Sequence, residues 1–394
     1  MQILIINSGS SSIKFQIIKM PSEEVLCKGM VERIGLNDSQ ISFDFGTRSF
    51  SETQSIANHE EGLNAITRLL TNSHTGVLTN TNEIDAVAHR VVHGGNQFDE
   101  PTVINDKVLG EVKRLASLAP LHNPANAEGI EISRRIFKNA KQVAIFDTAF
   151  HQTIPEKAYR YAIPKSLSDE HHIRVYGFHG TSHKYVSDRV ITYLDRKQSK
   201  IISIHLGNGC SMTAIKDGIS IDHSLGFSPS NGLIMGTRSG DIDHSIIFYL
   251  MDKLGVGSDE LNQLLQEQSG LLGLTGYSDL REIQSAAKQG NTDCQLALTM
   301  TAYRIKKFIG SYIAVLNGAD AIVFTAGIGE NSSLLRAMVC EDMEWTGIQL
   351  DPEKNNKRAS DILEIQGETS KMKILVVPTN EELEIAKQTF VLLQ

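Results

Sequence analysis

The feature that most constrains this chain is a strand, a polar glycine corner and a second strand, a pattern that occurs twice. Near the N-terminus two apolar runs flank residues 7–12, Asn-Ser-Gly-Ser-Ser-Ser, which offer hydroxyl, amide and backbone N–H groups. The second copy spans residues 200–218, and its corner reads Gly207-Asn208-Gly209. Donor-rich corners between buried strands suit anionic oxygen clusters such as polyphosphates. Two of them predict a nucleotide held between two related halves.

A second recurrence supports this division into halves. The apolar segments 84–95 and 320–331 share an Asp-Ala pair near the start and glycines near the end, and each follows a glycine-cornered hairpin. Gly327-Ile328-Gly329 in the second segment is expected to form a third glycine corner. We therefore prefer an ancient duplication to a coincidence of two strand patterns. Further strands are expected at 2–7, 12–19, 25–34, 41–45, 142–147 and from 372. Helices are expected at 59–72, 123–139 with Asn123 as N-cap, 244–254, 258–268, 278–289, 293–317 and the C-terminus.

These elements predict an α/β fold with mixed sheets flanked by helices and a nucleotide cleft between two domains. The aperiodic stretch 151–176 is the expected boundary, which gives domains 1–150 and 151–379. The net charge of −8 over 394 residues argues against nucleic acid or an anionic membrane as the main partner. Four scattered cysteines without a CxxC pair fit a reducing compartment. No signal peptide or spanning segment is evident, so we expect a cytoplasmic protein.

Two arginines are candidates for binding anions. Arg90 lies inside an apolar strand, and a buried guanidinium requires an anionic partner because it cannot be neutralised by deprotonation. That partner is either a carboxylate of the chain, such as Asp147, or a substrate carboxylate or phosphate; we prefer the substrate, because the strand runs directly into Gly94-Gly95. Arg238 lies in the glycine-rich loop 226–241, whose composition resembles a mobile element that delivers charge to a transition state. A solvated loop arginine is the alternative.

Histidine and carboxylate patterns suggest further roles. The pairs His89/His93 and His179/His183 have i, i+4 spacing, but the first lies on a strand and the second lacks an HExxH glutamate, so zinc is not expected. His179 suits a donor to a phosphoryl oxygen, with a structural histidine as the alternative. For Mg²⁺, which binds oxygen ligands, the best-placed carboxylates are Asp147 at a strand end and Glu381 at a strand-to-helix junction.

Together these motifs resemble the acetokinase family, within the wider group that includes actin, hexokinase and Hsp70 ATPase domains. The resemblance covers essentially the whole chain in family order. It rests on residues 7–15, 89–95, 146–151, 176–183, 205–209, 235–241, 324–331 and 379–382. It implies two RNase H-like (actin/hexokinase-type) domains, with the C-terminal helix 380–394 completing the first. The implied activity is reversible, Mg²⁺-dependent transfer of the ATP γ-phosphoryl to acetate by direct in-line attack, with Mn²⁺ able to substitute for Mg²⁺.

The resemblance also implies a role for individual residues. It places Arg90 on the acetate carboxylate, Asn7 and Glu381 at the metal, and Asp147, His179 and Arg238 in catalysis. Glu382, next to Glu381, is the alternative metal ligand. The implied nucleotide site comprises Lys14, His205, Leu206, Gly207, Asn208, Gly209, Asp279, Leu280, Arg281, Gly327, Ile328, Gly329, Glu330 and Asn331. A homodimer is implied as well.

Two other functions are compatible with the sequence. A sibling kinase could act on propionate, because one methylene in an apolar pocket changes discrimination by only about 1–3 kcal/mol. A nucleotide-switched binding protein of the same superfamily is the alternative of a different class. Such proteins need a partner-binding domain or a polymer surface, and the resemblance leaves no extra domain.

Overall fold

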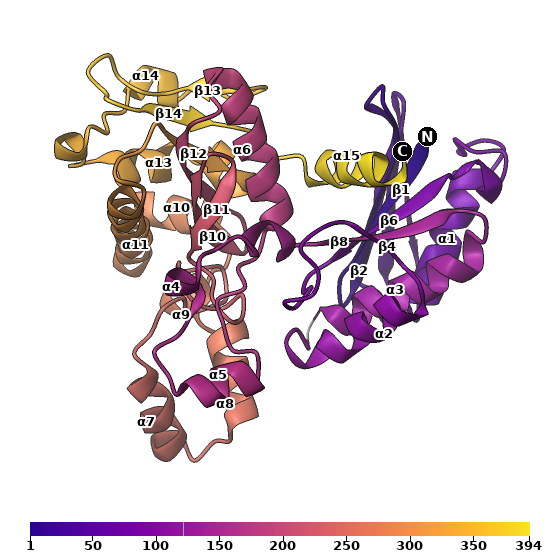
Figure 1. Cartoon of the computed structure of the whole chain (residues 1–394), viewed down its shortest axis with the longest axis horizontal. Coiled ribbons are helices and arrows are strands. Elements are labelled where there is room, and N and C mark those ends of the chain that lie inside the picture. Colours follow the sequence, from indigo (N-terminus) through magenta and orange to yellow (C-terminus); the bar gives the residue numbers. More distant parts are fainter. Residues whose placement is uncertain (121) are drawn as a thin grey trace. The chain divides into compact units, whose positions relative to one another are not determined.

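The computed structural model describes residues 1–120 and 122–394, which divide by their internal contacts into two compact units. Unit 1 comprises Met1–Phe150 and Asn380–Gln394, and unit 2 comprises His151–Thr379. Each unit contains one mixed sheet flanked by helices (Figure 1). Among the described residues, no helix has both the length and the apolar character needed to cross a membrane.

Unit 1 is built on an eight-stranded sheet with the order β5-β4-β3-β2-β1-β6-β8-β7. Its strands are β1 (Gln2–Ser8), β2 (Ser12–Lys19), β3 (Glu24–Glu32), β4 (Ser39–Phe45), β5 (Arg48–Gln54), β6 (Ala86–Val91), β7 (Thr102–Val103) and β8 (Lys141–Phe146). Its helices are α1 (His59–Thr71), α2 (Asp106–Arg114), α3 (Asn123–Ile136) and α15 (Glu381–Leu393). Strand β1 is antiparallel to β2 and parallel to β6, which is parallel to β8.

The central strand β1 is apolar on both faces because helices cover both. Leu4 and Ile6 belong to a core with residues of α1, whereas Ile3 and Ile5 belong to another with Ile385 of α15. Successive side chains of a strand point to opposite faces, so a strand covered on both sides reads as a continuous apolar run. Figure 1 shows α15 on the opposite side of this sheet from α1 and α3. The C-terminal helix therefore completes the core of unit 1.

Unit 2 is built on a six-stranded sheet with the order β11-β10-β9-β12-β14-β13. Its strands are β9 (Lys200–Leu206), β10 (Cys210–Lys216), β11 (Ile219–His223), β12 (Ala321–Thr325), β13 (Leu363–Glu364) and β14 (Lys373–Val376). Its helices are α4 (Glu156–Tyr159), α5 (Lys165–Glu170), α6 (Gly180–Leu194), α7 (His244–Leu254), α8 (Ser258–Glu267), α9 (Gly270–Thr275), α10 (Leu280–Lys288), α11 (Thr292–Leu316), α12 (Ala326–Asn331), α13 (Ser333–Cys340) and α14 (Pro352–Asn355).

The two sheets have the same core topology, which confirms the predicted relation between the halves. In each, a first strand is antiparallel to the second and parallel to two later strands, giving the matching orders β3-β2-β1-β6-β8 and β11-β10-β9-β12-β14. The predicted hairpins at 2–19 and 200–216 are the equivalent β1–β2 and β9–β10 pairs. The predicted Asp-Ala strands are the equivalent β6 and β12.

Two local predictions are wrong. Asn123 is the first residue of α3 and not its N-cap, which is His122. The Asn123 side chain instead accepts a hydrogen bond from the backbone N–H of His93, 3.1 Å away. Residues Gly327 to Gly329 form no open corner but lie inside the short helix α12. The turn into this helix is made at Ala326, whose φ of +64° is in the left-handed region.

Candidate active site

Four of the predicted site residues meet in unit 1 at the ends of adjacent elements. Asn7 lies near the end of β1, Arg90 near the end of β6, and Asp147 directly after β8. These three strands are neighbours and parallel, so their carboxyl ends lie at the same edge of the sheet. Glu381 is the first residue of α15.

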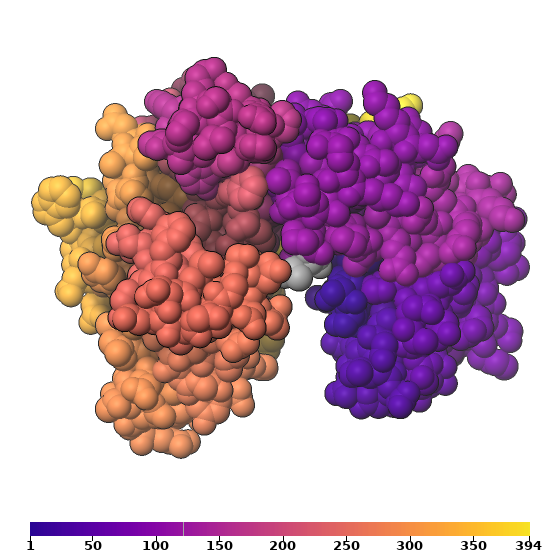
Figure 2. Space-filling view, turned by 90° about the horizontal axis from the view of Figure 1, so that it is seen from below, coloured from indigo at the N-terminus to yellow at the C-terminus, as the bar shows by residue number. Residues whose placement is uncertain are grey.

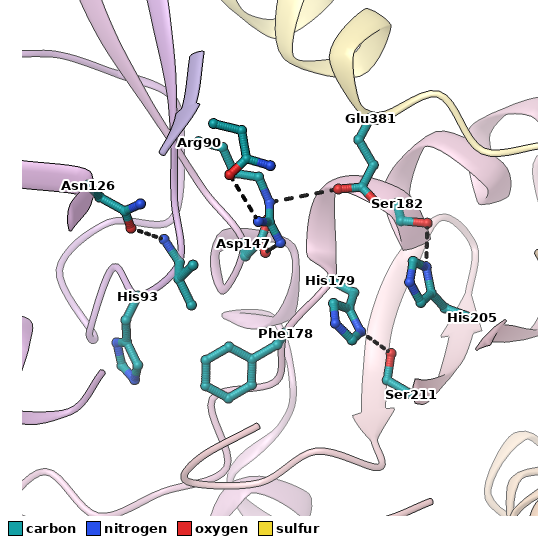
Figure 3. Close-up of polar contacts among 12 residues, drawn as sticks. Arg90, His93, Asn126, Asp147, Phe178, His179, Ser182, His205, Ser211 and Glu381 are labelled. Atoms are coloured by element: carbon teal, nitrogen blue, oxygen red, sulfur yellow. Dashed lines mark hydrogen bonds and ion pairs between the residues drawn. The ribbon is translucent and has the colours of Figure 1, made fainter. Parts of the chain in front are cut away.

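The Arg90 guanidinium is the centre of this group. It contacts the Asp147 carboxylate through two nitrogens, with 3.1 Å between Nε and Oδ1 and a second, shorter contact between Nη2 and Oδ2. Nη1 lies 3.4 Å from the Asn7 amide oxygen, and Nε lies 3.7 Å from the Glu381 carboxylate (Figure 3). Burial would lower the pKa of Arg90, but the Asp147 and Glu381 carboxylates outweigh it and raise this pKa. Asp147 is thus a carboxylate partner of Arg90 from within the chain, which was the alternative to a substrate anion in the prediction from sequence.

Negative charge accumulates around Arg90. The Asp147 side chain is 1% exposed and that of Glu381 is 25% exposed. Burial, together with Asp147 and Glu382, raises the pKa of Glu381 to about 7 despite the opposing charges of Arg90 and Lys14. Lys14 is exposed and lies opposite Asn7 in the β1–β2 ladder. A cation at this edge of the sheet would relieve the repulsion between the carboxylates.

The oxygen donors of this group fit Mg²⁺. The amide oxygen of Asn7 and the carboxylate of Glu381 are the hard ligands that Mg²⁺ prefers, and Mg²⁺ commonly takes only one or two protein ligands beside water and phosphate. In residues 1–120 and 122–394, no cluster of three or more His, Cys, Asp or Glu side chains has a metal-binding arrangement. Asn7 and Glu381 would supply two protein ligands of this kind.

In unit 2 the backbone places His179 in an unusual conformation. His179 is the N-cap of α6 and has a φ of +56°, in the left-handed region that non-glycine residues seldom adopt. Strained backbone of this kind is concentrated at functional sites. The ring Nδ1 lies 2.9 Å from the Ser211 hydroxyl (Figure 3), and the ring stacks on His205 with 4.4 Å between centroids.

His179 and Arg238 converge at Gly209. A Cβ atom added to Gly209 would lie 3.2 Å from His179 Nε2 and 3.7 Å from Arg238 Nη1. The Arg238 guanidinium donates to the carbonyl of Pro229 over 2.8 Å. Among the described residues it has no carboxylate partner, and burial lowers its pKa. A partly buried cation of this kind suits an anionic ligand.

The loop that carries Arg238 is packed rather than free. Backbone hydrogen bonds join Gly236 to Asn208, Ser269 to Thr237, and Leu271 to Met235. The predicted mobile element is therefore a buried connection that holds Arg238 beside Gly209.

A cavity of about 650 Å³ in unit 2 gathers three of the predicted nucleotide-binding segments. Nine predicted residues line it: Leu206, Gly207, Asn208, Asp279, Leu280, Arg281, Gly327, Ile328 and Asn331. Five others do not. His205 stacks on His179, and Gly209 faces His179 and Arg238. Gly329 lies against the backbone of β12, and the Glu330 carboxylate accepts a hydrogen bond from the Thr379 N–H. Lys14 belongs to unit 1.

Several residues around the cavity and His179 were not predicted. Gln284 and Leu335 line the cavity, and Gln284 follows Arg281 by three residues on α10, a spacing that could have indicated it.

His183 does meet His179, but at a shared serine, Ser211, and not at a metal. His89 is buried and bonded to Gln142, which assigns it a structural role.

Comparison with known proteins identifies the fold and the family of the chain. Its fold is that of acetate and propionate kinases of known structure. The acetate kinase of Porphyromonas gingivalis superposes with a TM-score of 0.94 at 42% identity, with both chains fully covered. A propionate kinase from Francisella tularensis superposes with a TM-score of 0.93 at 41% identity, covering 98% of each chain.

Sequence comparison gives the family itself. The model of the acetokinase family matches residues 2–387. An acetate kinase of Flavobacterium johnsoniae is 60% identical over 394 residues, which is the full length of both chains. The chain belongs to the acetokinase family.

Proposed function

We propose that this chain is an acetate kinase, which reversibly transfers the γ-phosphoryl group of ATP to acetate to give acetyl phosphate and ADP. The observation that carries the proposal is the pair His179 and Arg238 at Gly209. Two donors suit a transferring phosphoryl group, and one of them is a cation that has no carboxylate partner in the part of the chain that the structure describes. The full-length match to curated acetate kinases supports the choice of acceptor.

Arg90 is the proposed ligand of the acetate carboxylate. Acetate is ionised at neutral pH, so the reaction needs no strong general base. Asp147 contacts Nε and Nη2 of Arg90 and thereby fixes the plane of the guanidinium. The Nη1–Nη2 edge then faces the substrate, although Nη1 also lies 3.4 Å from the Asn7 amide oxygen. In this account Asp147 orients Arg90 and does not accept a proton.

The cavity lined by Leu206, Asp279 and Ile328 is the proposed nucleotide site. Its volume of about 650 Å³ lies within the range of small-molecule pockets, and both apolar and polar residues line it. Bound Mg²⁺, for which Mn²⁺ could substitute, would be held by Asn7 and Glu381 and would neutralise charge on the phosphates. His179 and Arg238 then stabilise the charge on the phosphoryl group during in-line transfer.

A trapping assay tests this proposal. The purified chain is incubated with ATP, MgCl₂ and acetate in the presence of hydroxylamine, which converts acetyl phosphate to a coloured hydroxamate. We expect hydroxamate and ADP in equal amounts, and neither product without acetate. ATP binding without acetate-dependent hydroxamate would instead favour a nucleotide-switched binding protein.

Propionate kinase is the second candidate, because a propionate kinase superposes nearly as well as the acetate kinase does. The same assay with propionate in place of acetate separates the two. Measuring ATP formation from acyl phosphate and ADP, without hydroxylamine, also compares the forward and reverse rates.

A homodimer is proposed from the exposed surface of α7. None of its eleven residues is buried, and it exposes Ile246, Phe248, Tyr249 and Leu254 by 41%, 69%, 60% and 53%. Figure 2 looks onto the face where salmon and orange atoms of this part of unit 2 lie at the surface. Large apolar side chains exposed on one helix in this way favour an interaction site there.

Sedimentation tests the dimer. We expect twice the chain mass for the natural protein and a monomer for Phe248→Glu. Trp345→Glu, at an isolated side chain that is 95% exposed, is the control and should stay dimeric.

A cytoplasmic location is proposed from the four cysteines, which are all buried and form no disulfide.

A further inference from the structure

A chain of two hydroxyls and two imidazoles links the core of unit 2 to His179. The Ser203 hydroxyl lies 2.8 Å from His183 Nδ1, and His183 Nε2 lies 2.7 Å from the Ser211 hydroxyl. The Ser211 hydroxyl in turn lies 2.9 Å from His179 Nδ1 (Figure 3 draws this last contact). Ser203, Ser211 and His183 are all fully buried. We call this set the Ser203–His179 chain.

Register explains why these groups face one another. Ser203 and His205 alternate on β9, Ser211 and Thr213 alternate on β10, and Ser211 pairs with His205 in the ladder. Alternate residues share one face of a sheet. Helix α6 packs against β9 and carries His183 one turn after its N-cap, His179.

Two proton arrangements along the Ser203–His179 chain give the Ser211 hydroxyl proton an acceptor within the described residues. A neutral imidazole has one donor nitrogen and one acceptor nitrogen, and a hydroxyl has a single proton. Either every donor points toward His179, or every donor points toward Ser203. His183 is neutral in both cases, since burial and the neighbouring His151 and His205 keep its pKa well below its ordinary value.

The hydrogen bonding of the Ser203 hydroxyl decides between the two proton arrangements. Its contact with His183 is the one hydrogen bond of this hydroxyl within the described residues. If every donor pointed toward Ser203, the Ser203 hydroxyl proton would be buried without an acceptor. A buried unsatisfied donor shifts such an equilibrium by roughly 5- to 100-fold. The favoured arrangement is therefore Ser203 O–H to His183 Nδ1, His183 Nε2–H to Ser211 Oγ, and Ser211 O–H to His179 Nδ1.

We propose that Ser203, His183 and Ser211 are positioning residues that hold neutral His179 as the Nε2–H tautomer, so that its proton is directed at the side of Gly209 and Arg238. The inference rests on the proposed role of His179 in phosphoryl transfer. In the opposite tautomer Nε2 would present a lone pair, which repels a phosphoryl oxygen. His179 can thus donate a hydrogen bond without carrying a positive charge.

Nitrogen NMR of protein with ¹⁵N-labelled histidine in a deuterated background tests the tautomer directly and needs no activity. The His179 ring signals are assigned by their absence in His179→Gln. We expect a protonated Nε2 and an unprotonated Nδ1 at pH 8. A protonated Nδ1 with a bare Nε2, or a doubly protonated ring, would overturn the inference.

Kinetics of matched variants test the role of the Ser203–His179 chain. Ser211→Ala should lower kcat at least tenfold, with KM for ATP and acetate within about twofold, and Ser211→Thr, which keeps the hydroxyl, should recover most of that loss. Ser203→Ala should populate both tautomers in the NMR spectrum. Ser187→Ala, at a buried serine of α6 whose hydroxyl donates to the Lys184 carbonyl, is the control and should change neither readout.

The outcomes separate this inference from the proposed function. Acyl phosphate formation without the Nε2–H tautomer overturns the inference alone. The predicted tautomer in a protein that forms no acyl phosphate overturns the proposed function. An unaltered tautomer and an unaltered kcat in Ser211→Ala show that the Ser203–His179 chain does not set the state of His179.

Discussion

Gly209→Ala is a small substitution that tests whether His179 and Arg238 act together. The added Cβ would lie 3.2 Å from His179 Nε2, 3.3 Å from His179 Cε1 and 3.7 Å from Arg238 Nη1. The first two distances are shorter than ordinary van der Waals contacts, so the imidazole must move by a few tenths of an ångström. The backbone at Gly209 is outside the left-handed region, and alanine can adopt it without strain.

The expected effect follows from this displacement. Misplacing a catalytic group by about 1 Å can cost about 100-fold in rate, so a shift of a few tenths should lower kcat by about 3- to 30-fold. The assay is initial-rate kinetics of acetyl phosphate formation, with thermal unfolding measured on the same preparations. The melting temperature should change by less than about 3 °C, since no buried group is lost.

Gly110→Ala provides the matched control. Gly110 is exposed within α2, and a Cβ there meets no atom within 4 Å. This change should leave kcat unaltered and stabilise the helix by about 0.5–1 kcal/mol. An unchanged kcat in Gly209→Ala, with the protein folded, would refute the idea that His179 and Arg238 must lie close to the reacting group.

Three further predictions follow from the site and the core. Arg90→Lys keeps the charge but loses the paired contact with Asp147, and should raise KM for acetate at least tenfold with KM for ATP unchanged; an effect on ATP alone would contradict the acetate role. Arg238→Ala should lower kcat by about 100-fold with little change in either KM, and an unchanged kcat would remove Arg238 from the transition state. Burial lowers the pKa of His89 to about 4, so neutral His89 contributes stability above pH 6.5 that is lost as the pH falls toward 4. Between pH 7 and pH 5, urea unfolding should show a loss of stability about 2 kcal/mol smaller in His89→Gln than in the natural protein, and equal losses would contradict a buried neutral His89.

The sequence could predict those parts of the fold that depend on local patterns. Apolar runs around Asn7 and around Gly207 to Gly209 indicated the two hairpins, and their shared order indicated related sheets. Local pattern failed at Asn123, because its side chain binds the backbone of His93, a residue thirty positions earlier in the chain. A cap and a tertiary contact compete for the same amide, and only the fold decides which forms.

The same distinction applies to the candidate site. A buried Arg90 required an anion, but its contact with Asp147 depends on strands β6 and β8 being neighbours, which no local pattern specifies. Ser203 and Ser211 look like ordinary polar residues within strands, and their link to His183 appears only through the β9–β10 register and the packing of α6. The i, i+4 spacing of His179 and His183 was visible, but the serine between their rings was not.

The relative kcat/KM for acetate, propionate and butyrate, measured with ATP and MgCl₂ on one preparation of the full chain, tests the proposed function most directly. We expect kcat/KM to be highest for acetate and to fall with each added methylene. A clear preference for propionate, or ADP formation that does not depend on any carboxylate, would contradict it.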